Sequence, residues 1–304
     1  MKKKFLITFL VAVIFFSGSY IFFSKYLDVL EAGSPKEVIK GVDLGEDNVI
    51  EQVVKHELLF LLTGVDYNQD GDEQNRVRTD TLMIVKVNLD NGEVDLLSIP
   101  RDTRVLIGNS MDKINHAHAY GGMALTLRTI RDWLNIDLDY FVKLDFKAVE
   151  EIVDAMGGVE VDVPVQIYEY QTGIFLEPGV QKLNGKEALY FARFREGYED
   201  GDLGRVKAQQ QLMQQIIKQM ISVENLPKIG DFFTTYAKRV DTNIPTSLIL
   251  SMIPTASKID TNNIQKYVIP GYADYIDETS YYIYDEEGTA QLIRNLLPEY
   301  ILEN

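Results

Sequence analysis

The chain has 304 residues, no cysteine, and a formal charge of −16 from 30 basic and 46 acidic side chains. With 46% hydrophobic and 25% charged residues, the composition is typical of globular proteins and excludes a wholly disordered chain. The absence of cysteine excludes disulfides, a thiol nucleophile and cysteine-ligated metal sites. The acidic balance argues against a general nucleic-acid-binding protein, but it is compatible with a local basic pocket.

The first 25 residues predict a membrane anchor. Three consecutive lysines, starting at Lys2, precede an apolar run from Phe5 to Phe23. A helix of this length spans roughly 28 Å, close to the hydrocarbon thickness of a bilayer. The lysines place the N-terminus in the cytoplasm, so we expect a single-pass cell-membrane protein with an extracellular domain. The alternative is a cleaved signal peptide, although no clear small-x-small cleavage pattern precedes Lys25.

The rest of the chain predicts a linker and one extracytoplasmic domain. Residues 26–56 are polar and are expected to form a stalk, and residues 57–304 show no strong internal boundary. Because residues 1–25 hold four lysines and no acid, the remainder carries a formal charge of −20. An anionic substrate would therefore need a local concentration of positive charge in order to bind.

Helices and strands alternate along this domain, which predicts the α/β fold class with a mixed central β-sheet flanked by helices. Short apolar or alternating runs predict strands at 58–65, 81–87, 94–99, 140–144 and 159–163. Helical patterns occur at 123–134, 146–156 and 203–223. Asn91-Gly92 predicts a hairpin between the second and third strands.

Two pairs of residues are candidate metal ligands. Asp66 follows the first strand and Asp80 opens the second, and two carboxylates with room for water and phosphate suit Mg2+. The alternative is that Asp80 ends a strand and Asp66 lies in a turn. His116 and His118 are expected in a loop or strand and could bind zinc, but no third ligand stands out.

Arginines recur at the ends of predicted elements. Arg101 comes just after the third strand, where functional groups of α/β sheets gather. Arg193 and Arg195 would project from one strand face, since residues two apart in a strand share a face. Arg205 and Gln209 would share a helix face near an N-terminus that favours anions. Ordinary surface ion pairs or solvated side chains are the alternative in each case.

Nine segments form an ordered set of motifs across the motif-bearing core at residues 57–222. They are Leu61-Leu62-Thr63-Gly64-Val65-Asp66, Arg78-Thr79-Asp80-Thr81, Ser98-Ile99-Pro100-Arg101-Asp102-Thr103, Lys113-Ile114-Asn115-His116-Ala117, Tyr120-Gly121-Gly122, Met156-Gly157-Gly158-Val159, Leu183-Asn184-Gly185-Lys186-Glu187-Ala188-Leu189, Phe191-Ala192-Arg193-Phe194-Arg195 and Gly201-Asp202-Leu203-Gly204-Arg205. Any one of them alone would be weak, but together and in this order they resemble the LytR-CpsA-Psr family of bacterial cell-wall enzymes.

The resemblance implies a membrane-anchored phosphotransferase. Such an enzyme moves an anionic glycopolymer, of the teichoic acid or capsular polysaccharide type, from an undecaprenyl-pyrophosphate carrier to peptidoglycan. Mg2+ or Mn2+ assists, and no nucleic acid takes part. The lipid chain would need an apolar tunnel, which we expect between the sheet and the helices, lined by the 123–156 region.

The resemblance also implies the site residues. Asp66 and Asp80 would hold the metal and, with Arg101 and Asp102, would form the catalytic group. The pyrophosphate-binding side chains would be Arg78, Arg101, Arg104, Lys113, Arg193, Arg195, Arg205 and Gln209. Asp102 is the spare carboxylate nearest to this arginine cluster.

Two other functions stay open at this stage. A polyprenyl or sugar pyrophosphatase would use the same site with water in place of the sugar hydroxyl. A non-catalytic cell-wall protein that binds polyanions or regulates the wall would need the positive charge without the chemistry.

Overall fold

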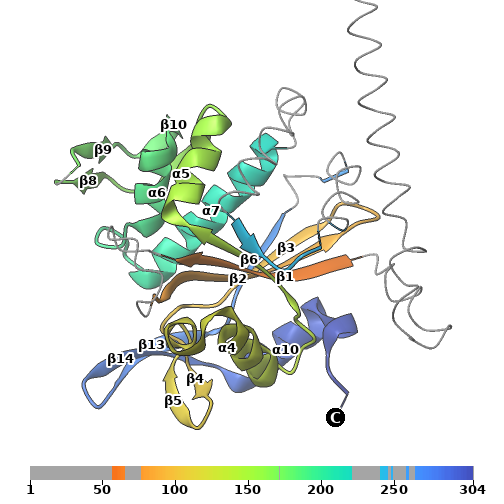
Figure 1. Ribbon diagram of the computed structural model, residues 1–304. Coiled ribbons are helices and arrows are strands. Elements are labelled where there is room, and N and C mark those ends of the chain that lie inside the picture. Colours follow the sequence, from red (N-terminus) through yellow and green to blue (C-terminus); the bar gives the residue numbers. More distant parts are fainter. Residues whose placement is uncertain are drawn as a thin grey trace, which may run out of the picture. The chain divides into compact units, whose positions relative to one another are not determined.

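The described part of the chain forms a mixed six-stranded β-sheet with helices on both faces (Figure 1). The computed structural model describes residues 57–65, 77–170, 172–220, 240–245, 248, 258–259 and 264–303. The predicted anchor at 1–25 and stalk at 26–56 lie outside these residues. In order of pairing, the strands are β11 (Val240–Thr242), β6 (Tyr140–Asp145), β1 (Glu57–Val65), β2 (Thr79–Asn88), β3 (Val94–Ser98) and β12 (Gln265–Val268).

The sheet contains both parallel and antiparallel pairs of neighbouring strands. β6 runs parallel to β1 and β12 runs parallel to β3, whereas the other neighbours are antiparallel. The prediction of a mixed sheet is therefore confirmed. No helix among the described residues is long and apolar enough to cross a membrane.

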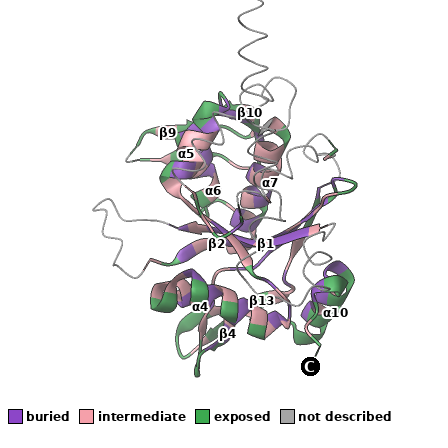
Figure 2. Cartoon of the chain, turned by 45° about the vertical axis from the view of Figure 1, so that its right-hand side comes forward, coloured by how far each residue is buried: buried purple, intermediate pink, exposed green. Residues whose placement is uncertain are grey.

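The central strands are buried on both faces, which explains their nearly continuous apolar sequences. Leu59 and Leu61 of β1 pack into the core below the sheet, and Leu58 and Leu62 pack into the core above it. Figure 2 shows buried residues along β1 and β2, between the two layers of helices.

Helices and small hairpins complete the two layers. On one side of the sheet lie α4 (His116–Leu134), α10 (Glu286–Leu296), a 3-10 turn (Pro298–Tyr300) and the hairpins β4–β5 (Arg104–Ile107, Ser110–Lys113) and β13–β14 (Gly271–Ile276, Thr279–Tyr284). On the other lie α5 (Phe146–Ala155), α6 (Gly185–Arg193), α7 (Asp202–Met220), the pair β7–β10 (Val159–Val163, Gly179–Leu183) and the hairpin β8–β9 (Ile167–Glu169, Ile174–Leu176).

The hairpin between β2 and β3 matches the prediction from Asn91-Gly92. Its register places Val87 opposite Val94, and Asn88 bonds across the turn to Glu93. Gly92 has φ of +77°, and a Cβ added there would lie 2.5 Å from the backbone of Lys258. The turn therefore needs glycine both for its backbone angle and for close packing.

Two local predictions are wrong. His116 and His118 lie in the first turn of α4, not in a loop or strand; α4 begins seven residues before the predicted helix because it runs across a kink at Gly121 and Gly122. Arg193 is the last residue of α6, not part of a strand. Asn184 caps α6 and forms a capping box with Glu187, a start signal that outweighs the alternating pattern further along.

A buried glutamine connects α7 to the sheet through hydrogen bonds. Gln210 is 4% exposed, and its Nε2 donates to the hydroxyl of Ser98 at 3.0 Å and to the carbonyl of Tyr267 at 2.7 Å. The N-terminal part of α7 is thereby held over the ends of β3 and β12.

We predict that Gln210→Ala lowers the free energy of unfolding by about 1–3 kcal/mol, because it leaves two buried oxygens without a donor. Chemical denaturation monitored by circular dichroism measures this loss. Gln211→Ala, on the next position of the same helix, is the control and is expected to change stability by less than about 0.5 kcal/mol. Equal losses in both variants would contradict the role of Gln210.

Candidate active site

The site begins where β2 starts and β3 ends. These strands are antiparallel, and the amide of Ile99 still donates to the carbonyl of Leu82, so the segment after β3 lies beside the first residues of β2. The side chains of Arg101 and Asp80 meet there, with Arg101 Nη1 2.5 Å from Asp80 Oδ1. The expectation that Arg101 emerges just after the third strand is confirmed, whereas Asp80 is the second residue of its strand and not the residue before it.

The backbone around Arg101 is fixed from two sides. The amide of Asn115 donates to the carbonyl of Arg101, and the amide of Tyr282 donates to the carbonyl of Asp102. The carboxylate of Asp102 lies 3.2 Å from Lys113 Nζ and 3.8 Å from Arg101 Nε. Asp102 therefore forms ion pairs with two cations, which helps to hold Arg101 in place.

A buried arginine at the start of α7 joins this pair. Arg205 is 3% exposed, and its Nη2 lies 2.8 Å from Asp202 Oδ1. Burial lowers the pKa of Arg205 from its ordinary value, the charges of Arg101 and Arg195 act in the same direction, and Asp202 and Asp80 oppose them. Two guanidinium groups from separate stretches, those of Arg101 and Arg195, thus lie within electrostatic reach of Arg205.

Two guanidinium nitrogens in this cluster are buried donors without an acceptor among the described residues. They are Nε of Arg101 and Nε of Arg205. A buried N–H that bonds to nothing is unfavourable by about 1–3 kcal/mol. An anion with several oxygens would supply acceptors and would also reduce the repulsion between the arginines.

The end of α6 brings the remaining arginines to α7. Gln209 Nε2 donates to the carbonyl of Ala192 at 3.2 Å, so Gln209 links the two helices. The guanidinium of Arg193 lies over the ring of Phe146, 4.3 Å from its centroid. Arg195 follows the helix end and is exposed, and its charge reaches Arg205. The two arginines therefore do not share a strand face, contrary to the prediction.

The weaker candidates lie at the edge of this cluster. Arg104 and Lys113 are opposite each other in β4–β5, and both lie over the ring of Tyr281, at 5.8 and 5.7 Å from its centroid. Arg78 is exposed just before β2. Lys113 pairs with Asp102, which also pairs with Arg101. The described side-chain contact of Arg104 is with Tyr281 of β14.

A divalent cation would fit at Asp80. Its Oδ1 is bonded to Arg101, so Oδ2 is the oxygen available to a metal, and Mg2+ needs only one or two carboxylates when phosphate and water complete its shell. Asp66 lies outside the described residues, so its pairing with Asp80 stays a prediction. No cluster of three metal-binding side chains occurs among the described residues.

The histidines have other partners. His116 Nδ1 lies 2.9 Å from Asp112 Oδ2, and Tyr120 donates to the same oxygen at 2.6 Å. These hydrogen bonds outweigh burial and lower the pKa of Asp112 below its ordinary value. His118 Nδ1 lies 2.7 Å from the carbonyl of Val77, just ahead of the strand that carries Asp80. Neither contact suggests a zinc site.

Known proteins match nearly the whole chain. Residues 27–297 match the LytR_cpsA_psr family. The chain belongs to the LytR-CpsA-Psr family. Polyisoprenyl-teichoic acid–peptidoglycan teichoic acid transferase TagU of Bacillus subtilis is 31% identical over 302 residues, covering 97% of this chain and 95% of the relative. TagU of Bacillus anthracis is 32% identical over 304 residues, covering 98% and 97%.

Solved structures of LytR-CpsA-Psr proteins have the same fold. The crystal structure of B. subtilis TagV matches with a TM-score of 0.72 and 30% identity, covering 82% of this chain and 99% of that chain. A structure of TagT bound to LI-WTA matches with a TM-score of 0.66 and 26% identity, covering 81% and 91%. The resemblance inferred from the motifs is confirmed.

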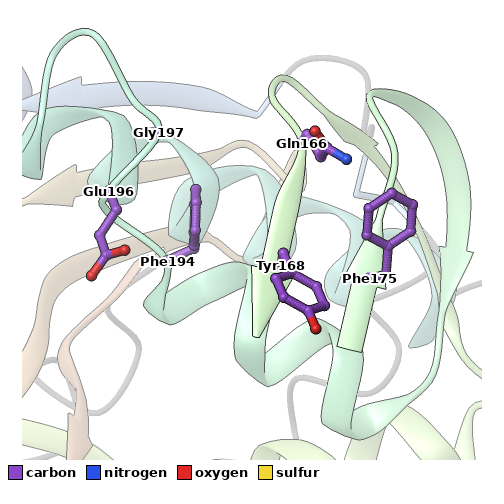
Figure 3. A pocket seen from close by; sticks show the side chains of 6 residues that line it. All are labelled: Gln166, Tyr168, Phe175, Phe194, Glu196 and Gly197. Atoms are coloured by element: carbon purple, nitrogen blue, oxygen red, sulfur yellow. The ribbon is translucent and has the colours of Figure 1, made fainter. Parts of the chain in front are cut away.

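A shallow, open cavity of about 510 Å3 lies on the same side of the sheet as α6 in this LytR-CpsA-Psr protein. Gln166, Tyr168 and Phe175 of the β8–β9 region line one side, and Phe194, Glu196 and Gly197 line the other (Figure 3). None of these residues belongs to the 123–156 region, so this cavity is not the expected lipid tunnel, which stays a prediction.

Sequence reasoning missed several partners of the site. The spacing of Asp202 and Arg205, three apart at a helix start, could have indicated their ion pair. No local sequence pattern indicates the contacts of Tyr281 with Arg104 and Lys113, because they arise from the pairing of β14 with residue 103.

We predict that His118 makes stability depend on pH. Burial lowers its pKa below the ordinary 6.5, so the folded state favours the neutral ring. This stability is present above pH 6.5 and is lost as pH falls through the lowered pKa, since the unfolded chain binds the proton first. The melting temperature should therefore fall less in His118→Leu than in the wild type between about pH 7.5 and 5.5. Identical slopes in thermal melts would contradict this.

Proposed function

We propose that this chain is a membrane-anchored phosphotransferase that moves an anionic glycopolymer from a polyprenyl-pyrophosphate carrier to peptidoglycan. The observation that carries the proposal is the gathering of Arg101, Arg195 and Arg205, with buried donors that lack acceptors, in a chain of formal charge −16. The relatives named as teichoic acid transferases support the same chemistry, and TagT bound to LI-WTA supports a lipid-linked wall polymer as donor.

The arginines would bind the diphosphate of the donor. A diphosphate diester carries about two negative charges, and a guanidinium presents its donors in a plane that matches phosphate oxygens. Arg101 and Arg205 would donate from their unmet Nε groups, and Arg195, which has no ion pair among the described residues, would approach from the solvent side. Their positive charges would stabilise the negative charge that develops on the leaving oxygen.

The reaction is a single exchange of bonds at phosphorus. The hydroxyl of a muramic acid residue attacks the phosphorus next to the glycopolymer and loses its proton, forming a phosphodiester. The bond from that phosphorus to the bridging oxygen breaks, and polyprenyl phosphate leaves. Asp80 and Asp66 would hold Mg2+ or Mn2+, which supplies neutralising charge at the phosphate oxygens. Asp102 would keep Arg101 and Lys113 in position.

We predict that Arg101→Ala and Asp80→Ala each lower transfer by about 100-fold or more, because each removes a group that balances charge in the transition state. The assay uses the full chain in detergent with lipid-linked glycopolymer, Mg2+ and peptidoglycan strands, and EDTA is expected to abolish transfer in the wild type. Arg128→Ala is the control, since within the described part of the chain Arg128 forms an exposed ion pair with Asp132 and no contact with the cluster.

The same assay separates the three functions. A transferase is expected to form a phosphodiester between glycopolymer and peptidoglycan when the acceptor is present. Release of free glycopolymer phosphate at the same rate with and without acceptor would identify a pyrophosphatase. Unchanged polymer attachment in cells and unchanged diphosphate cleavage in both variants would refute an enzymatic role for the cluster.

We propose that residues 1–25 anchor the protein in the cell membrane, with residues 57–304 on the outer side. The support is the lysine-flanked apolar run from Phe5 to Phe23. The protein is expected in the membrane fraction after a high-salt wash, and protease added to intact protoplasts should digest it down to a short protected N-terminal fragment. Release by the salt wash, or full protection from protease, would contradict this topology.

A further inference from the structure

The β8–β9 hairpin carries three exposed aromatic side chains. Tyr168, Tyr170 and Phe175 are 54%, 84% and 49% exposed. Tyr168 is directly opposite Phe175 in the strand pairing, with ring centroids 6.3 Å apart, and Tyr170 lies 6.4 Å from Tyr168. Such a group of aromatic rings in contact with water is typical of a binding surface.

The cavity beside these rings has mixed chemistry. Figure 3 shows Tyr168 and Phe175 next to each other on the hairpin, with Phe194 and Glu196 on the segment after α6. Gln166 adds an amide, so aromatic faces and hydrogen-bonding groups line one space of about 510 Å3. A pyranose ring has the complementary character, because its C–H face is apolar and its rim carries hydroxyl groups.

The hairpin is held firmly against the helical layer. The hydroxyl of Tyr190 in α6 donates to the carboxylate of Glu169 at the end of β8. Ile167 and Leu176 are buried in the same core cluster as Phe191. The exposed rings are therefore presented on a fixed support, which favours binding because little conformational entropy is lost.

One residue connects this cavity with the anion site along the chain. Arg195, whose charge acts on Arg205, lies in sequence between Phe194 and Glu196, and both of these neighbours line the cavity. A ligand in the cavity would therefore contact the segment that carries Arg195, which we propose binds the diphosphate.

The charge of the cavity selects between the two substrates. Glu196 is the one charged side chain among the six residues that line the cavity. An anionic donor polymer would be repelled by this carboxylate, whereas the glycan backbone of the acceptor presents hydroxyl and acetamido groups without charge.

We propose that the cavity is the acceptor subsite, which binds a hexose ring of a peptidoglycan glycan strand. Tyr168 and Phe175 contact the C–H face of the sugar, and Gln166 and Glu196 bond to its polar rim. This inference rests on the proposed transfer function, and it adds where the acceptor binds.

The test compares Tyr168→Ala and Phe175→Ala with Tyr275→Ala, which removes a 72% exposed tyrosine from the separate β13–β14 hairpin. The full chain in detergent is assayed with uncrosslinked peptidoglycan strands and lipid-linked glycopolymer. Each cavity variant is expected to raise KM for the strands by about tenfold, as the loss of one aromatic contact predicts. The donor KM, and diphosphate cleavage without acceptor, should stay at wild-type values.

Three results would overturn the subsite. They are an unchanged acceptor KM, a raised donor KM, or an equal effect in Tyr275→Ala. If the acceptor KM is unchanged while the wild type still transfers polymer, the proposed function stands and the subsite alone is refuted. If the wild type transfers nothing, calorimetric titration of the same strands decides: binding that weakens in Tyr168→Ala but not in Tyr275→Ala supports the subsite, and equal binding in all proteins refutes it.

Discussion

Repulsion between guanidinium groups is the constraint on which the site depends. Burial of Arg205 removes the water that would screen like charges, so Arg101 and Arg195 both oppose the charged form of Arg205. Asp202 and Asp80 offset part of this repulsion at Arg205, yet the Nε atoms of Arg101 and Arg205 still lack acceptors in the described part of the chain. A ligand that brings several anionic oxygens would supply these acceptors and reduce the repulsion, and a diphosphate has this chemical character.

The fold keeps this strained group of charges together through contacts that do not involve the charges. Backbone hydrogen bonds from Asn115 and Tyr282 fix the segment that carries Arg101, and Gln210 fixes the helix that carries Arg205. Gln209 adds a bond to the carbonyl of Ala192 that joins α6 and α7, and its expected contact with the substrate stays a prediction. Positioning by neutral amides suits phosphoryl transfer, in which most of the protein's contribution is placement and charge neutralisation.

The sequence predicted those parts of the protein that depend on local signals. The strands of the sheet and the β2–β3 hairpin follow from apolar runs and from Asn91-Gly92, and Arg101 was placed correctly because it follows a strand that ends at a proline. The prediction of a strand around Arg193 is wrong, since a capping box that begins nine residues earlier, at Asn184, starts a helix. The aromatic hairpin at Tyr168 had no recognised signal, because its meaning depends on a cavity built from a distant segment.

The tight turn at Gly92 has a consequence at the opposite end of its hairpin. Side chains alternate between the faces of a sheet, so slipping β3 by one residue against β2 would move every one of its side chains to the other face. The turn leaves little freedom for such a slip, since its glycine has φ of +77° and packs against the backbone of Lys258. A change in this remote loop that shifted the register would thus separate Arg101 from Asp80, so a segment that touches no substrate helps to set the geometry of the site.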